Sequence, residues 1–163
     1  MISNFPADKY QRPIKDLRIS VTDRCNFRCN YCMPAEIFGE SYKFLPKPEL
    51  LSFEEIERLA KIFAQLGVNK IRITGGEPLV RKNIESLVKA LSNIDGIADL
   101  TMTTNGFLLS KYAKSLRDSG LNRLTVSLDS LDEKVFNEMS GVKHGPQKTL
   151  DGINSAIEEG FEN

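Results

Sequence analysis

Strand-like and helical patterns alternate along the chain from residue 17 onward. Four short runs rich in β-branched residues predict β-strands at 17–21, 70–74, 99–104 and 123–129. Amphipathic segments with apolar residues at helical spacing follow, and they end before Gly67, Gly96, Gly120 and Gly160. Ser52 and Glu55 form a capping-box pattern at the start of the first helix. This order predicts βα units around a parallel sheet.

Each predicted strand has one apolar and one polar face. The polar positions are Arg18 and Ser20, then Lys70, Arg72 and Thr74, then Thr101 and Thr103, then Thr125, Ser127 and Asp129. Strands of a parallel sheet that is covered on both faces are normally apolar throughout. The polar face therefore predicts a curled sheet, a partial barrel, whose inner face lines a cavity for a polar ligand. The alternative is an ordinary sheet with this face against solvent.

Charge is balanced over the whole chain but not on this polar face. Lys plus Arg number 22 and Asp plus Glu number 22, so the net charge indicates no general attraction to nucleic acid or to an anionic membrane. Arg18, Lys70 and Arg72 share the polar face, where cations need a counter-charge, and they predict an anionic ligand such as phosphate. The chain lacks a membrane-spanning apolar stretch and a signal-peptide pattern, so we expect one cytoplasmic domain.

The three cysteines of the chain, Cys25, Cys29 and Cys32, lie within eight positions after the first predicted strand. An α/β fold places its active site beyond the carboxyl ends of its strands. Three close cysteines argue against a disulfide framework and for metal binding in a reducing compartment. They suit a 4Fe–4S cluster that keeps one iron free for a small molecule, whereas a structural zinc site needs a fourth ligand. Zinc and inert cysteines are the alternatives, and His144, the single histidine, is expected in an exposed loop.

The spacing Cys-x3-Cys-x2-Cys, with Tyr31 before the last cysteine, resembles the signature of the radical S-adenosylmethionine superfamily. In that family S-adenosylmethionine binds the free iron and is reductively cleaved to methionine and a 5′-deoxyadenosyl radical. A second motif, TGGEP at 74–78, resembles the family's element that holds the amino group of S-adenosylmethionine. Its two glycines allow close backbone approach, and we expect Glu77 to present its carboxylate to the cationic groups of that ligand.

Longer stretches resemble the GTP 3′,8-cyclase family of molybdenum cofactor biosynthesis. They are DLRISVTDRCNFRCNYCMP (16–34), KIRITGGEPLVRK (70–82), MTTNG (102–106) and VSLDSLD (126–132). The resemblance implies a cluster on Cys25, Cys29 and Cys32, S-adenosylmethionine contacts from Tyr31, Gly76 and Ser127, and GTP contacts from Arg18, Arg72 and Thr103, with Lys70 a weaker candidate near the phosphates. The implied activity is that of a lyase, which cyclises GTP to (8S)-3′,8-cyclo-7,8-dihydroguanosine 5′-triphosphate.

The same resemblance implies the fold. We expect an α/β fold, a partial (β/α) TIM-like barrel of the radical SAM type, truncated after about four βα units. The incomplete core fills residues 1–163, and 1–13 form a flexible N-terminal segment. Complete members carry a second 4Fe–4S cluster on three further cysteines, and this chain has no fourth cysteine. We therefore expect the chain alone to be incomplete for turnover.

The implied partners follow from the same family. They are GTP as substrate, an external one-electron donor, a downstream pterin-forming enzyme and a second copy in a homodimer, with neither nucleic acid nor a membrane. Two alternatives remain: a radical SAM peptide maturase and a non-catalytic fragment that binds a cluster. The cations Arg18, Lys70 and Arg72 favour a nucleoside triphosphate over a peptide.

Overall fold

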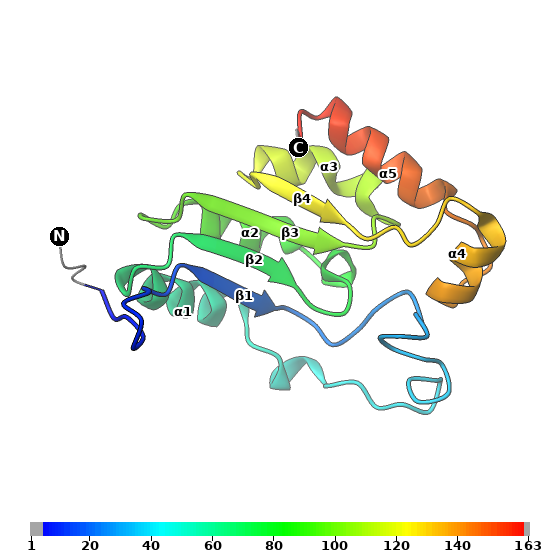
Figure 1. The fold of residues 1–163 in the computed structure, drawn as a ribbon, viewed down its shortest axis with the longest axis horizontal. Helices are drawn as coiled ribbons and strands as arrows, with labels where there is room; N and C mark the ends of the chain where they lie inside the picture. The colour runs from blue at the N-terminus through cyan, green and yellow to red at the C-terminus, as the bar shows by residue number, and fades with distance from the viewer. Residues whose placement is uncertain (1–4, 162–163) are drawn as a thin grey trace.

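The computed structural model describes residues 5–161 and shows a parallel sheet with helices (Figure 1). The strands are β1 (Asp16–Ser20), β2 (Lys70–Thr74), β3 (Asp99–Thr104) and β4 (Arg123–Val126). The helices are α1 (Phe53–Gln65), α2 (Ile84–Ser92), α3 (Leu109–Asp118), α4 (Glu133–Ser140) and α5 (Gln147–Glu158), with the short 3₁₀ helices η1 (Lys47–Glu49) and η2 (Pro78–Val80). Neighbouring strands are parallel in the order β1-β2-β3-β4, which confirms the predicted βα units.

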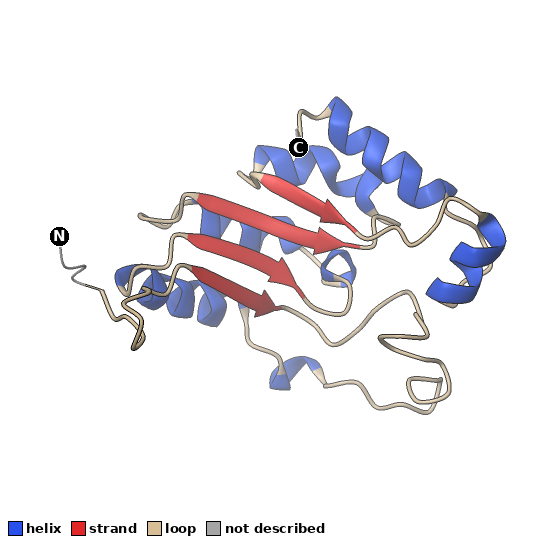
Figure 2. Ribbon diagram, in the orientation of Figure 1, coloured by secondary structure: helices blue, strands red, loops and turns tan. Residues whose placement is uncertain are grey.

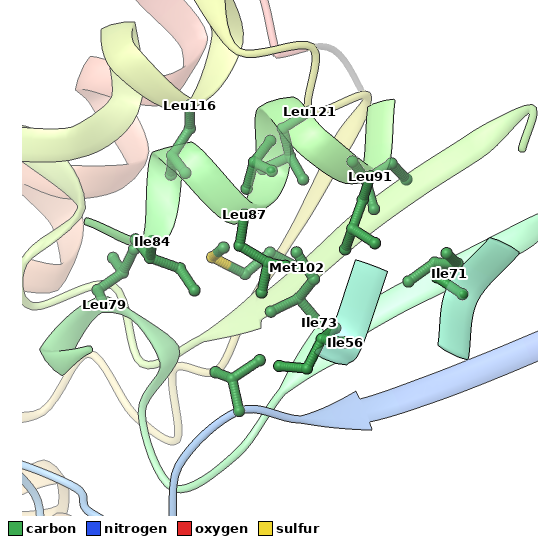
Figure 3. Packing of buried hydrophobic residues seen from close by; sticks show 14 of the residues in the cluster. Ile56, Ile71, Ile73, Leu79, Ile84, Leu87, Leu91, Met102, Leu116 and Leu121 are labelled. Atoms are coloured by element: carbon green, nitrogen blue, oxygen red, sulfur yellow. The ribbon is translucent and has the colours of Figure 1, made fainter. Parts of the chain in front are cut away.

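Helices α1, α2 and α3 lie behind one face of the sheet and form the hydrophobic core with it, α5 packs beside α3, and α4 lies beyond the carboxyl ends of the strands (Figures 2 and 3). Ile71 and Ile73 of β2 and Met102 of β3 are fully buried there. They belong to one cluster with Ile56 of α1 and Leu87 of α2. Burying a side chain of this size contributes roughly 1.5–3 kcal/mol. The apolar face that the alternation predicted is therefore the face that holds the helices on the sheet.

The opposite face is polar, and no helix of the described residues lies in front of it (Figure 2). Arg18, Ser20 and Thr125 are exposed, while Arg72 and Thr103 are partly buried. The register places Arg18 beside Arg72 and Thr103 beside Thr125. The predicted division into an apolar and a polar face is confirmed. Within residues 5–161 the polar face is open, because four strands do not close a barrel.

The start of α1 is the capping box that its sequence predicts. The Ser52 hydroxyl accepts a hydrogen bond from the Glu55 amide at 3.1 Å, and the Glu55 carboxylate accepts one from the Ser52 amide at 2.7 Å. These bonds satisfy amides that the helix itself leaves unpaired. They also fix the point where the long segment after β1, residues 21–52, rejoins the helical layer.

Two features of the last third differ from the sequence prediction. β4 ends at Val126 instead of residue 129: the Ser127 amide still bonds to the Thr104 carbonyl at 2.9 Å, and the chain then leaves the sheet. Helix α4 was not predicted. Asp132 caps it by accepting from the Val135 amide at 2.9 Å, but Phe136 is its one buried large side chain, so the apolar pattern is too short to be recognised.

Residues 7–13 form a turn before β1. Ala7 and Pro13 make an antiparallel bridge, and Asp8 pairs with Arg12 at 2.6 Å. The flexibility of 1–13 stays a prediction, and residues 1–4 lie outside the described residues. No helix within 5–161 is both long and apolar enough to cross a membrane.

Candidate active site

The cysteines lie in the long segment that leaves the carboxyl end of β1, as the sequence predicts. This segment, residues 21–52, is called the cysteine segment below. Cys25 and Cys29 are partly buried, Cys32 is exposed, and all three thiols are free. The Cys29 carbonyl accepts hydrogen bonds from the amides of Cys32 at 3.1 Å and Met33 at 2.8 Å. This tight turn folds the chain back after Cys29, so the second and third cysteines lie on one short bend.

Helix α4 supports the cysteine segment from behind. Its last two carbonyls, of Met139 and Ser140, accept hydrogen bonds at 3.0 Å from the amides of Asn30 and Arg28 respectively. Phe27, which is 3 % exposed, packs edge-to-face on Phe136 of α4 with ring centroids 6.0 Å apart. Because these bonds join the main chains, α4 fixes the backbone on both sides of Cys29.

His144, after α4, completes an aromatic cluster under this segment. It is exposed, as predicted. Its ring lies 4.6 Å from that of Phe107 and 5.9 Å from that of Phe27. The cluster links the cysteine segment to the start of α3, and it gives His144 a packing role.

The TGGEP motif runs beside the start of the cysteine segment and bonds to it. The Gly76 amide donates to the Thr22 carbonyl at 2.7 Å, and the Glu77 amide donates to the Arg24 carbonyl at 2.8 Å. A Cβ atom on Gly76 would lie 2.3 Å from the Arg24 carbonyl oxygen. A glycine is therefore required here because two backbones touch, and this contact positions the residue before Cys25.

Glu77 is turned into the protein, so the expectation that it presents its carboxylate to a ligand is wrong for this structure. It is 1 % exposed. Its oxygens accept hydrogen bonds from the Leu79 amide at 3.0 Å, the Thr104 hydroxyl at 2.8 Å and the Asn105 amide at 2.7 Å. Burial raises the pKa of the Glu77 carboxyl, and these hydrogen bonds oppose that rise. The side chain joins η2 to the carboxyl end of β3.

Asn105, which was not among the predicted site residues, and Asp129, which was predicted only as a polar strand position, also reach the cysteine segment. Asn105 follows β3, and its side-chain Nδ2 donates to Asn26 Oδ1 at 2.9 Å and to the Cys25 sulfur at 3.9 Å. Asp129, beyond β4, accepts the Tyr31 hydroxyl at 3.0 and 3.1 Å. Desolvation first, and then this bond, raise the pKa of the Tyr31 phenol. The signal was their position after strands, inside the stretches 102–106 and 126–132.

Arg81 holds the two ends of the cysteine segment together, another contact that the sequence did not reveal. Its guanidinium donates to the Val21 carbonyl and to the Leu51 carbonyl, both at 2.6 Å. The same group lies 4.4 Å from the ring centroid of Phe53, a cation–π distance. Residues 21 and 51 are thus tied at the base of the segment that carries the three cysteines.

On the polar face, Arg18 and Arg72 are the cations with no ion pair inside residues 5–161. They are register partners on β1 and β2. Arg72 donates to the hydroxyls of Thr103 and Thr125, each at 3.4 Å, and the Arg18 guanidinium bonds to no described residue. Two adjacent guanidinium groups repel each other, so an anion between them would be stabilised.

Lys70 differs from these arginines, because the structure supplies its counter-charge. It begins β2, at the opposite end of the sheet from the cysteines, with its amine 3.4 Å from Asp16 and 3.9 Å from Asp99. Asp99 also binds Arg123, which lowers the pKa of the Asp99 carboxyl. The expectation of an unpaired cation here is wrong, and a role for Lys70 near phosphates stays a prediction.

The remaining predicted residues lie at the carboxyl edge of the sheet. Ser127 is exposed directly after β4, and Tyr31 is 61 % exposed on the cysteine segment. Contacts of Tyr31, Gly76 and Ser127 with S-adenosylmethionine, and of Arg18, Arg72 and Thr103 with GTP, stay predictions.

Three free thiols on one segment form a donor set that suits an iron–sulfur cluster. Within residues 5–161 no group of three or more His, Cys, Asp or Glu side chains is gathered around one ion position. A cubane suits such thiols, because each thiolate binds a different iron. Burial raises the pKa of the Cys25 and Cys29 thiols. Metal binding at these sulfurs would therefore release protons.

Comparisons with known proteins give the family. The sequence model of the radical SAM protein family matches residues 19–163 of this chain. A GTP 3′,8-cyclase of Staphylococcus epidermidis is 59 % identical over 155 residues, which cover 95 % of this chain and 46 % of that protein. The enzyme of the same name from Staphylococcus haemolyticus is 58 % identical over 154 residues, with coverages of 94 % and 45 %.

Solved structures give the same fold. Methylornithine synthase has a TM-score of 0.69 at 16 % identity, over 92 % of this chain and 43 % of that one. SuiB of Streptococcus suis has a TM-score of 0.70 at 24 % identity, over 90 % and 32 %. These likenesses confirm a partial barrel of the expected type, and the chain spans about half the length of the curated relatives it matches. The match over residues 19–163 shows that the chain belongs to the radical SAM superfamily.

Proposed function

We propose that this chain forms the amino-terminal part of a GTP 3′,8-cyclase. In this proposal, Cys25, Cys29 and Cys32 hold a 4Fe–4S cluster, and the polar face of the sheet binds GTP. When bound, such a cluster supplies the electron that cleaves S-adenosylmethionine to methionine and a 5′-deoxyadenosyl radical, which begins the cyclisation of GTP. The chain's own residues bind and orient the two small molecules.

The observation that carries the proposal is the meeting of four segments at one edge of the sheet. The cysteine segment after β1 bonds to Gly76 and Glu77 after β2, to Asn105 after β3, and through Tyr31 to Asp129 after β4. A barrel of the TIM type uses this edge for its active site. A ligand at this edge would therefore lie next to the cysteines and above the polar face.

The polar face supports a triphosphate as the second ligand. Arg18 and Arg72 are side by side, and Thr103 offers a hydroxyl within reach of Arg72. A guanidinium binds phosphate oxygens through two parallel hydrogen bonds. Each charge-assisted bond contributes roughly 1.5–3 kcal/mol. Loss of one arginine is therefore expected to weaken GTP binding about tenfold or more.

The first test is anaerobic reconstitution with iron and sulfide, followed by metal analysis and electron paramagnetic resonance. About four irons per chain are expected for a cubane. Zinc in place of iron, or no metal, would overturn the proposal.

The second test adds S-adenosylmethionine, a reductant and GTP, and separates the products by chromatography. Residues 1–163 alone are expected to give slow 5′-deoxyadenosine that does not depend on GTP, and no cyclised nucleotide. The same chain extended to the length of its relatives is expected to give both products. Cyclised nucleotide from residues 1–163 at the rate of the extended protein would contradict our account of the substrate site.

A further inference from the structure

Arg28 lies between the first two cysteines, and its side chain binds the backbone of the segment that carries them. One terminal nitrogen of the guanidinium donates to the carbonyls of Cys25 and Phe27, both at 2.8 Å. The Nε atom donates to the Phe38 carbonyl, also at 2.8 Å. One side chain thus joins the first cysteine to the returning limb of the segment at Phe38, ten residues after Arg28.

The positive charge of Arg28 has no carboxylate partner. Within residues 5–161, the ion pairs involve other cations, such as Arg12, Lys70 and Arg123. Arg28 is partly buried, and with Cys25, Phe38 and Glu40 it lines a cavity of about 450 Å³. A partly buried cation without a counter-ion is costly unless a negative group completes the site.

A cluster held by three thiolates is such a negative group. Its net charge becomes more negative when it accepts an electron, so a nearby cation stabilises the reduced form more than the oxidised form. Net charge, hydrogen bonds and solvent exposure are the factors that set the reduction potential of such clusters. A cluster on the three cysteines would therefore supply the negative charge that Arg28 lacks among the described residues, next to the carbonyl of Cys25 that Arg28 already binds.

We infer that Arg28 is a positioning residue of the cluster site, which fixes the backbone around Cys25 and raises the reduction potential of the bound cluster. The inference rests on the proposed function only in its second part, since the backbone contacts exist without a cluster.

The test compares Arg28→Met, which removes the charge and the donors, with Arg28→Lys, which keeps the charge but lacks the planar fork that reaches separate carbonyls. Arg24→Met is the matched control. Arg24 and Arg28 lie at similar distances from the Phe44 ring, 5.7 and 5.6 Å, but the Arg24 guanidinium donates to no carbonyl of the described residues.

In the metal-free chain, the measurement is the rate at which the cysteines react with iodoacetamide. Losing one charge-assisted hydrogen bond shifts a local opening equilibrium about tenfold. Arg28→Met is therefore expected to speed alkylation of Cys25 about tenfold or more, Arg28→Lys to speed it less, and Arg24→Met to leave it unchanged. Equal rates in the parent and in both Arg28 variants would overturn the positioning role.

In the reconstituted chain, the measurement is the midpoint potential of the cluster, determined by a redox titration that is monitored by electron paramagnetic resonance. The potential is expected to fall in Arg28→Met and to stay near the parent value in Arg28→Lys, because lysine keeps the charge. An unchanged potential in Arg28→Met would overturn the charge role.

The two failures can be told apart. If the parent chain takes up no iron, the proposed function and the charge role fail together, while alkylation still decides the positioning role. Circular dichroism checks that each variant is folded. If Arg28→Met is unfolded, Arg28→Gln takes its place in both measurements.

Discussion

Replacing Gly76 with alanine should loosen the cysteine segment from the sheet. The added Cβ would lie 2.3 Å from the Arg24 carbonyl oxygen and 2.6 Å from its carbon, well inside any normal contact. Both are backbone atoms, so no side chain can rotate to relieve the overlap. The two backbone segments must move apart. The hydrogen bonds from the Gly76 amide to the Thr22 carbonyl and from the Glu77 amide to the Arg24 carbonyl must then lengthen or break.

The expected loss of stability in Gly76→Ala follows from these two hydrogen bonds. Each contributes about 0.5–1.5 kcal/mol net, and the displaced amides and carbonyls lose further free energy where they stay buried. We expect Gly76→Ala to lower the free energy of unfolding by about 2–3 kcal/mol. For a chain of this size, that corresponds to a melting temperature lower by about 4–12 °C.

Gly96→Ala is the matched control for this experiment. Gly96 has φ +92°, where alanine is strained, but a Cβ there would meet nothing within 4 Å. Gly96→Ala should lower the free energy of unfolding by about 1–2 kcal/mol, through backbone strain alone. Thermal unfolding and iron uptake are measured for both variants. Gly76→Ala should lose iron binding and Gly96→Ala should keep it. A Gly76→Ala protein that has the melting temperature of the parent and binds as much iron would refute the reasoning.

Three further outcomes are expected. Alanine at any one of the three cysteines, for example Cys29→Ala, should abolish the brown absorbance and the iron content after reconstitution, because one corner of the cubane loses its thiolate; full iron content would show that this cysteine is not a ligand. Arg72→Ala in the extended protein should weaken GTP binding about tenfold or more in calorimetry and leave the iron content intact, since it removes a charge-assisted contact; unchanged affinity would contradict a role of the polar face in GTP binding. Asp99→Asn should lower the urea midpoint near pH 7 by a small amount, and the difference from the parent should shrink as the pH is lowered below the ordinary Asp range. A carboxyl whose pKa is lowered in the fold by Arg123 contributes stability above its unfolded pKa and loses it as the pH falls through the folded pKa. A difference that does not shrink on acidification would show that the ion pair is not its cause.

The layout of the fold could be predicted from local patterns in the sequence. Alternation with a period of two separated Ile71 and Ile73 from Arg72, and the structure places them on opposite faces of β2. The capping pattern of Ser52 and Glu55 gave the start of α1. These features are predictable because they depend on neighbours within a few residues, where backbone geometry fixes which side chains share a face.

The partners of the charged and polar side chains could not be predicted in this way, because they depend on the folded chain. Glu77 and Lys70 look alike in sequence as charged residues near a ligand site, yet Glu77 is buried against Asn105 and Lys70 is paired with Asp16. The carbonyls of α4 that hold the cysteine segment come from more than one hundred residues further along the chain, at Ser140. The free energy of a charged or polar group depends on what surrounds it, and that surrounding is assembled from distant parts of the chain only when it folds.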